Sequence, residues 1–208
     1  LTLELDSHTA DAGLETRIEA FLDIVASYRQ LLQNKAIEEN KEPFVQADTI
    51  LKDKKLMIVS SSGEHIHLTD KRVTVLIPSM GQLSSESLAE VMKAQGINAK
   101  VQPAPCEEIL KIGRSNSTCK ECLPLIITTG TMVDYIQSHQ KEGEVLVYFM
   151  PSAAGPCRFG QYNVFMKNLI KNNKFNDVAV LSLTSENSYA GMGTNFQILT
   201  WAGAVITD

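Results

Sequence analysis

Two stretches, Arg72-Val-Thr-Val-Leu-Ile-Pro78 and Glu144-Val-Leu-Val-Tyr-Phe-Met150, decide the fold class of this 208-residue chain. Each is a short, nearly continuous apolar run rich in β-branched or aromatic residues, which is typical of a strand buried on both faces of a sheet. Apolar residues between them recur at helical spacing, most clearly in Leu83–Ala94 and Leu123–Gln137. Because strands alternate with helices, we expect a small doubly wound α/β domain with a mainly parallel sheet and helices on both faces.

The other predicted elements of this domain follow from the same two periodicities. We expect a hairpin of 56–59 with 65–68, strands at 99–101 and 178–183, and helices at 107–112 (ending at Gly113), 162–170 and 194–205. The last of these helical patterns is strongly apolar and stops without a capping signal. The sequence therefore predicts an α/β domain over residues 56–208 that is truncated at its C-terminus.

The first 55 residues have a different character. Leu1–Asp6 predicts a strand, and apolar residues from Leu14 to Leu32 recur at the period of an amphipathic helix. Gln33–Lys55 is mostly polar and charged, which favours a surface connector. We therefore expect residues 1–55 to form an N-terminal strand, a helix and a charged connector.

Composition excludes several classes of protein. With 44% apolar residues the chain can bury a core, and its net charge of −5 argues against general nucleic-acid binding, which needs a basic face. No run approaches the roughly 20 apolar residues of a membrane span, so we expect no membrane association. Four cysteines are too few for a disulfide-stapled scaffold, and they indicate metal or redox chemistry instead.

Three of the four cysteines lie where a metal or cluster site is plausible. Cys119 and Cys122 form a C-x-x-C pair directly before a predicted helix, whose N-terminus favours thiolate. Cys157 follows the strand at 144–150, and loops at the carboxyl ends of parallel strands border the ligand crevice. The flanking Gly155 and Gly160 would let the backbone approach a bulky inorganic group and donate N–H groups to its sulfurs.

Duller interpretations of the same residues remain open. Free cysteine is often simply a small buried side chain, and one C-x-x-C pair is only half of a zinc site. Cys106 has no such context and is interpreted as structural. The glycine-containing segment 187–193 matches neither a dinucleotide fingerprint nor a P-loop, and a plain strand-to-helix turn explains it. No histidine has an evident nucleophile partner, so the sequence does not support a hydrolytic triad.

Three segments together resemble one family. They are Asp6-Ser-His-Thr-Ala-Asp-Ala-Gly-Leu-Glu-Thr-Arg-Ile-Glu-Ala-Phe-Leu22, Cys119-Lys-Glu-Cys-Leu-Pro-Leu-Ile-Ile-Thr-Thr-Gly130 and Tyr148-Phe-Met-Pro-Ser-Ala-Ala-Gly-Pro-Cys-Arg-Phe-Gly-Gln-Tyr162. The chain is similar to the region downstream of the ATPase modules in large activase proteins of the 2-hydroxyacyl-CoA dehydratase system. The resemblance covers most of the chain except Gln33–Lys71.

The resemblance implies a dehydratase-like iron–sulfur domain. Cys122 and Cys157 match the first two cluster ligands of the family, whose third ligand comes later than Asp208. Cys119 stands where relatives tend to have a small residue, so it is a weaker candidate ligand. Arg158, beside Cys157, matches the family string as a donor to a carboxylate or to cluster sulfur.

The expected function is therefore ATP-coupled, single-electron delivery by a cytoplasmic, anaerobic-type protein, with a [4Fe–4S] or related cluster in the full-length parent. The resemblance implies two partners, namely ATPase activator domains of the same polypeptide and an acyl-CoA dehydratase component; a homodimer is compatible with the sequence. The fragment alone is expected to lack activity and to hold little cluster. Two alternatives stay open: a non-catalytic docking module with buried structural cysteines, and a zinc or redox module built on Cys119 and Cys122.

Overall fold

The computed structural model describes residues 18–32 except 20, 24, 27 and 31, and then residues 44–52, 55–118, 120–153 and 155–183. Internal contacts divide the chain into two compact units, residues 1–43 and residues 44–208. The second unit thus begins at Phe44, earlier than the expected start at residue 56. The predicted strand at 1–6, the segment 187–193 and the predicted helix at 194–205 lie outside the described residues.

In the first unit, every described residue from Ile18 to Leu32 is helical, which confirms the predicted helix for these residues. Several members of its apolar stripe are exposed, among them Leu22, whose exposed fraction is 58%. The amphipathic pattern therefore forms the helix that it predicts, but much of the apolar stripe remains open to solvent.

In the second unit, four strands form the predicted parallel sheet, in the order β5-β4-β6-β7. Their bounds are β4 (Val73–Ile77), β5 (Ala99–Val101), β6 (Val145–Phe149) and β7 (Val178–Leu181). The register places Val75 of β4 opposite Ala99 on one side and Val147 on the other. Every residue of β4, β6 and β7 is buried, as expected for a parallel sheet covered on both faces.

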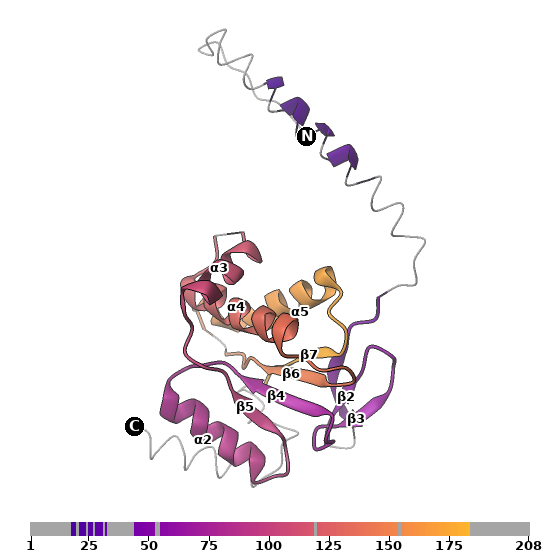
Figure 1. Ribbon diagram of the computed structural model, residues 1–208, viewed down its shortest axis with the longest axis vertical. Coiled ribbons are helices and arrows are strands. Elements are labelled where there is room, and N and C mark those ends of the chain that lie inside the picture. Colours follow the sequence, from indigo (N-terminus) through magenta and orange to yellow (C-terminus); the bar gives the residue numbers. More distant parts are fainter. Residues whose placement is uncertain are drawn as a thin grey trace. The chain divides into compact units, whose positions relative to one another are not determined.

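Helices cover the two faces of this sheet. The described helices of the second unit are α2 (Gln82–Lys93), α3 (Glu107–Ser115), α4 (Leu123–Ser138) and α5 (Tyr162–Asn173), with a 3₁₀ turn, η1 (Arg158–Gln161), before α5. Val75 packs in one hydrophobic cluster with Met92 of α2. Its neighbour Leu76 packs in the other cluster with Met132 of α4 and Met166 of α5. Figure 1 shows α2 on one side of the sheet and α4 and α5 on the other, which confirms the predicted α/β fold.

Helix α3 differs from its prediction at the C-terminal end. Gly113 does not end the helix, which continues to Ser115. A Cβ atom on Gly113 would lie 2.0 Å from the backbone oxygen of Ile126 in α4, and one on Gly130 would lie 2.2 Å from the oxygen of Ile109. Gly113 is therefore present because two helices cross closely there, a requirement that periodicity within one helix does not reveal.

A small antiparallel sheet precedes the parallel one, in the order β1-β2-β3. Its strands are β1 (Asp48–Lys52), β2 (Lys55–Val59) and β3 (His65–His67). The pairing of β2 with β3 confirms the predicted hairpin. The interpretation of the whole Gln33–Lys55 stretch as a connector is wrong for β1, which pairs with the adjacent strand β2. Its Thr49 Oγ1 also donates to the distant Val180 carbonyl at 3.2 Å.

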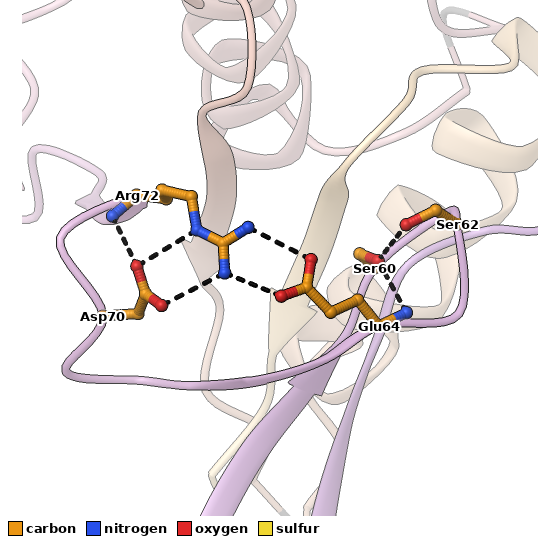
Figure 2. Close-up of polar contacts among 5 residues, drawn as sticks. All are labelled: Ser60, Ser62, Glu64, Asp70 and Arg72. Carbon is orange, nitrogen blue, oxygen red and sulfur yellow. Dashed lines mark hydrogen bonds and ion pairs between the residues drawn. The ribbon is translucent and has the colours of Figure 1, made fainter.

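Hydrogen bonds and ion pairs among polar side chains connect the loops on the two sides of β3 (Figure 2). The Arg72 guanidinium, just before β4, donates to both carboxylate oxygens of Glu64 at 3.1 and 2.8 Å and to those of Asp70 at 3.3 and 3.2 Å. Ser60 Oγ accepts the backbone N–H of Glu64 at 3.0 Å and bonds with Ser62 Oγ at 2.8 Å. The Arg72 hydrogen bonds lower the pKa of Glu64 and of Asp70. Because these carboxylates are solvent-exposed, the network orients the loops more than it stabilises the fold.

Candidate functional site

The strand order identifies the edge of the sheet where a ligand is expected. The chain passes from β4 to its neighbour β5 and then returns across the sheet to β6, on the other side of β4. Open α/β sheets bind ligands outside the carboxyl ends of the strands, where the chain changes direction in this way. The loops that leave β4 (78–81) and β6 (150–157) border this point, and Cys157 lies in the second.

Cys122 approaches the same region from α4. It is the N-cap residue of that helix, with Pro124 in the first turn, which confirms its predicted place at a helix N-terminus. Its half-buried Sγ lies 2.5 Å from the hydroxyl of Tyr162, the first residue of α5. This contact joins the N-terminal ends of two helices that are distant in sequence.

Tyr162 connects the two cysteines electrostatically. Burial is the main cause that raises the pKa of its hydroxyl, followed by the hydrogen bond with Cys122 and by the charges of Cys122 and Cys157. A hydrogen bond from the backbone N–H of Leu125 lowers this pKa. Because a hydroxyl oxygen can accept two hydrogen bonds, either Tyr162 or Cys122 can be the donor in the bond between them. Tyr162 thus links Cys122 to the start of α5, five residues after Cys157 in the chain.

The two glycines near Cys157, Gly155 and Gly160, have different surroundings. Cys157 is exposed and is the N-cap residue of η1. Gly155 has a φ of 135°, which a side chain would disfavour, and open space surrounds the position of a Cβ. A Cβ on Gly160 would instead lie 2.6 Å from the backbone oxygen of Ala153. Open space therefore adjoins Gly155, Gly160 lets η1 fold against the preceding residues, and the predicted approach of both to a cofactor stays a prediction.

The other two cysteines have different surroundings. Cys106 is exposed at the N-cap of α3, where its hydrogen bond to Glu108 lowers the pKa of that carboxyl. Cys119 lies outside the described residues, so a role for the C-x-x-C pair stays a prediction. Cys106 and Cys157 are exposed and Cys122 is half-buried. Burial in the core therefore does not apply to Cys106 and Cys157, whereas Cys122 packs at the edge of a hydrophobic cluster.

A cavity opens beside Cys122. Its volume is about 560 Å³, and it lies between the start of α4 and the η1–α5 segment. Arg158, predicted from the sequence as a cofactor-binding residue, lines it together with Lys120. A neighbouring cavity of about 410 Å³ shares Phe165 and Asn168 with it. The structure thus brings Arg158 and Cys122 to one cavity.

Sequence reasoning gave no role to Tyr162. The residue ends the string Cys157-Arg-Phe-Gly-Gln-Tyr162 and begins a predicted helix, but no spacing rule relates it to Cys122. An aromatic hydroxyl at the start of a helix, five residues after a candidate ligand, was the one available signal. The histidines His65 and His67 are exposed on β3, as expected for a solvated face.

The described residues contain no group of three or more His, Cys, Asp or Glu side chains placed to hold a metal ion. Among the described helices, none has both the length and the apolar character needed to cross a membrane. Comparisons of the chain with protein-family models, with curated proteins and with solved structures found no match. A functional proposal therefore depends on the geometry of the site and on the motifs that it contains.

Proposed function

We propose that this chain is part of an activase-related protein that delivers single electrons, coupled to ATP hydrolysis, to a partner of the 2-hydroxyacyl-CoA dehydratase type. Cys122 and Cys157 would provide two ligands of an oxygen-sensitive iron–sulfur cluster. ATPase activator domains of the same polypeptide would drive the transfer, and the protein would work in the cytoplasm of an anaerobic cell.

The observation that carries this proposal is that Cys122 and Cys157 are both accessible at the starts of α4 and η1, the elements that border the expected ligand crevice. The two cysteines are 35 positions apart in sequence and belong to different loops. Cys122 nevertheless contacts Tyr162, which follows the loop of Cys157 along the chain. Structural cysteines are typically buried and inert, whereas ligand cysteines need access for the metal. The exposure of Cys157 and the partial exposure of Cys122 support the second role.

The two cysteines make up part of the ligand set that an iron–sulfur cluster needs. A [4Fe–4S] cluster is held by four ligands, commonly thiolates, and the described residues supply two. The remaining ligands would come from Cys119 or from residues beyond the described ones. When bound, such a cluster supplies one-electron transfer at low potential.

The chain's own residues would prepare this site in two ways. The hydrogen bond between the Tyr162 hydroxyl and Cys122 Sγ would fix the direction of the cysteine side chain, as partners of metal ligands commonly do. The N-terminus of α4, at which Cys122 lies, favours negative charge on the sulfur.

Anaerobic reconstitution with iron and sulfide tests the proposal. We expect the longer polypeptide that contains this chain to gain visible absorption and an EPR signal on reduction, and the isolated chain to retain little iron. The double variant Cys122→Ala/Cys157→Ala should lose the cluster from the longer polypeptide. Cys106→Ala is the matched control, because Cys106 is an exposed cysteine outside the site, and it should leave the cluster unchanged.

Two results would contradict the proposal. One is an unchanged cluster in the double variant. The other is stoichiometric zinc in protein purified in air and lost on Cys119→Ser substitution, which would favour the zinc module instead.

A further inference from the structure

The side chains that line the cavity beside Cys122 carry a net positive charge. Lys120 and Arg158 lie on its wall, and neither side chain pairs with a carboxylate in the part of the chain that the structure describes. With Glu121, the charged side chains on the wall are two cations and one anion, so the cavity has an excess of positive charge that favours an anionic ligand.

The Glu121 carboxylate on the cavity wall offsets part of this positive charge, but its oxygens bond to their own loop and to neither cation. Both oxygens of Glu121 are engaged by its own loop: Oε1 accepts the hydroxyl of Thr118 at 2.8 Å, and Oε2 accepts the backbone N–H groups of Thr118 and Lys120 at 3.0 and 3.1 Å. Glu121 therefore shapes the loop that carries Lys120, and the charged side chains of Lys120 and Arg158 remain available to a ligand.

The start of α4 does not offer the set of backbone donors that holds a phosphate group. Pro124 has no N–H group, the N–H of Leu125 bonds to Tyr162, and the N–H of Ile126 bonds to the carbonyl of Cys122 at 3.2 Å. A phosphate site at a helix N-terminus uses several free N–H groups. Recognition of an anion here would therefore depend on the guanidinium and the ammonium groups, and a guanidinium fork matches a carboxylate well.

Apolar side chains form much of the rest of the cavity. Leu125 is buried at its inner end, Val164 is 56% exposed on α5, and Phe165 continues into the neighbouring cavity. A cavity of about 560 Å³ lies in the range of small-molecule sites. A hydrocarbon chain laid along these three residues would remove their exposed surface from water.

We propose that this cavity binds a small amphiphilic carboxylate, whose carboxylate group contacts Arg158 and Lys120 and whose apolar body lies along Leu125, Val164 and Phe165. The bound molecule lies against the Cys122 thiol, so its presence can be detected by protection of that thiol. The inference uses only the metal-free protein and does not depend on the proposed cluster.

Protection of Cys122 from alkylation by iodoacetamide, with hexanoate as the probe, tests this proposal. Trypsin cleaves after Lys120, so mass spectrometry reads Cys119 and Cys122 on separate peptides. We expect hexanoate to slow alkylation of Cys122 in a saturable way, with Cys106 as the internal reference. Hexanamide, which has the same size without the charge, should need at least about tenfold higher concentration, the usual effect of removing one charged hydrogen-bond partner.

Variants assign the effect to the cavity. Arg158→Gln should raise the half-protecting concentration of hexanoate by about tenfold. Lys171→Gln, which removes an exposed cation of α5 that is not part of the cavity wall, should leave it unchanged. Equal protection by hexanoate and hexanamide, protection by inorganic phosphate at the same concentration, or no protection at all would each overturn the proposal. The comparison of probes on the unmodified protein remains decisive if a variant fails to fold.

Discussion

Replacement of Gly113 by alanine tests the close crossing of α3 and α4 that supports the cysteine-bearing loop. The added Cβ would lie 2.0 Å from the backbone oxygen of Ile126 and 2.9 Å from its carbonyl carbon. Ordinary contacts of a Cβ atom begin at 3.4 Å, so the helices would have to separate by more than 1 Å. Rotation of a side chain cannot relieve this contact, because the nearest atom belongs to the backbone of α4.

Two opposing effects set the magnitude. Alanine is favoured over glycine inside a helix by about 1 kcal/mol. Overpacking of a close contact costs about 1–3 kcal/mol and occasionally more, and a backbone neighbour places this site at or above the upper end. We therefore expect Gly113→Ala to lower the free energy of unfolding by about 2 kcal/mol.

Urea unfolding followed by circular dichroism measures this change, with unchanged m-values as the check that the comparison is sound. Lys111→Ala is the matched control on the same helix, since it removes only an exposed ion pair with Glu107 and should alter stability by less than about 0.5 kcal/mol. If Gly113→Ala is as stable as the unmodified protein or more stable, the reasoning is refuted. The gain in helix propensity would then be at least as large as the cost of overpacking at the helix crossing. Faster alkylation of Cys122 in Gly113→Ala would show that the disturbance reaches the site.

Two pH dependences follow from the shifted groups. Arg72 holds the pKa of Glu64 below its ordinary 4.5 and that of Asp70 below its ordinary 3.8, so their contribution is present above these values and is lost as pH falls through the folded pKa. The urea midpoint of the unmodified protein should therefore fall more steeply in acid than that of Arg72→Gln, and parallel acid slopes would contradict the network of Figure 2. At the alkaline end, burial raises the pKa of Tyr148 above its ordinary 10.0, so the folded form keeps a proton that the unfolded chain loses. Stability should then fall as pH rises above 10.0, less so in Tyr148→Phe, and an equal alkaline decline in both proteins would show that Tyr148 is not the cause.

Local patterns in the sequence were sufficient for most of the fold. The run Val73–Ile77 forms a strand because its β-branched residues suit a pleated, buried surface, and the alternation of strands with helices allows little but a parallel sheet. Cys122 was placed at a helix N-terminus for the same reason, since proline in the following turn marks the start of a helix.

Features that depend on distant residues were not predictable in this way. Strand β1 follows a polar, charged stretch in the sequence, and its Thr49 Oγ1 donates to the Val180 carbonyl, a partner 131 positions away. In the sequence, Gly113 looks like the end of a helix. In the structure it lies where α3 crosses α4, and only glycine leaves enough space for the backbone of Ile126 there.

The sequence by itself therefore determined the parallel α/β fold and the two loops that carry Cys122 and Cys157, since periodicity and turn chemistry are local properties of the chain. Only the tertiary structure decided that Cys122 contacts the hydroxyl of Tyr162, and that Arg158 and Lys120 share one cavity beside Cys122. The physical reason is that hydrogen bonds, desolvation and charge fall off within a few ångströms. Residues 40 positions apart interact only after the sheet and its crossing helices have brought them together.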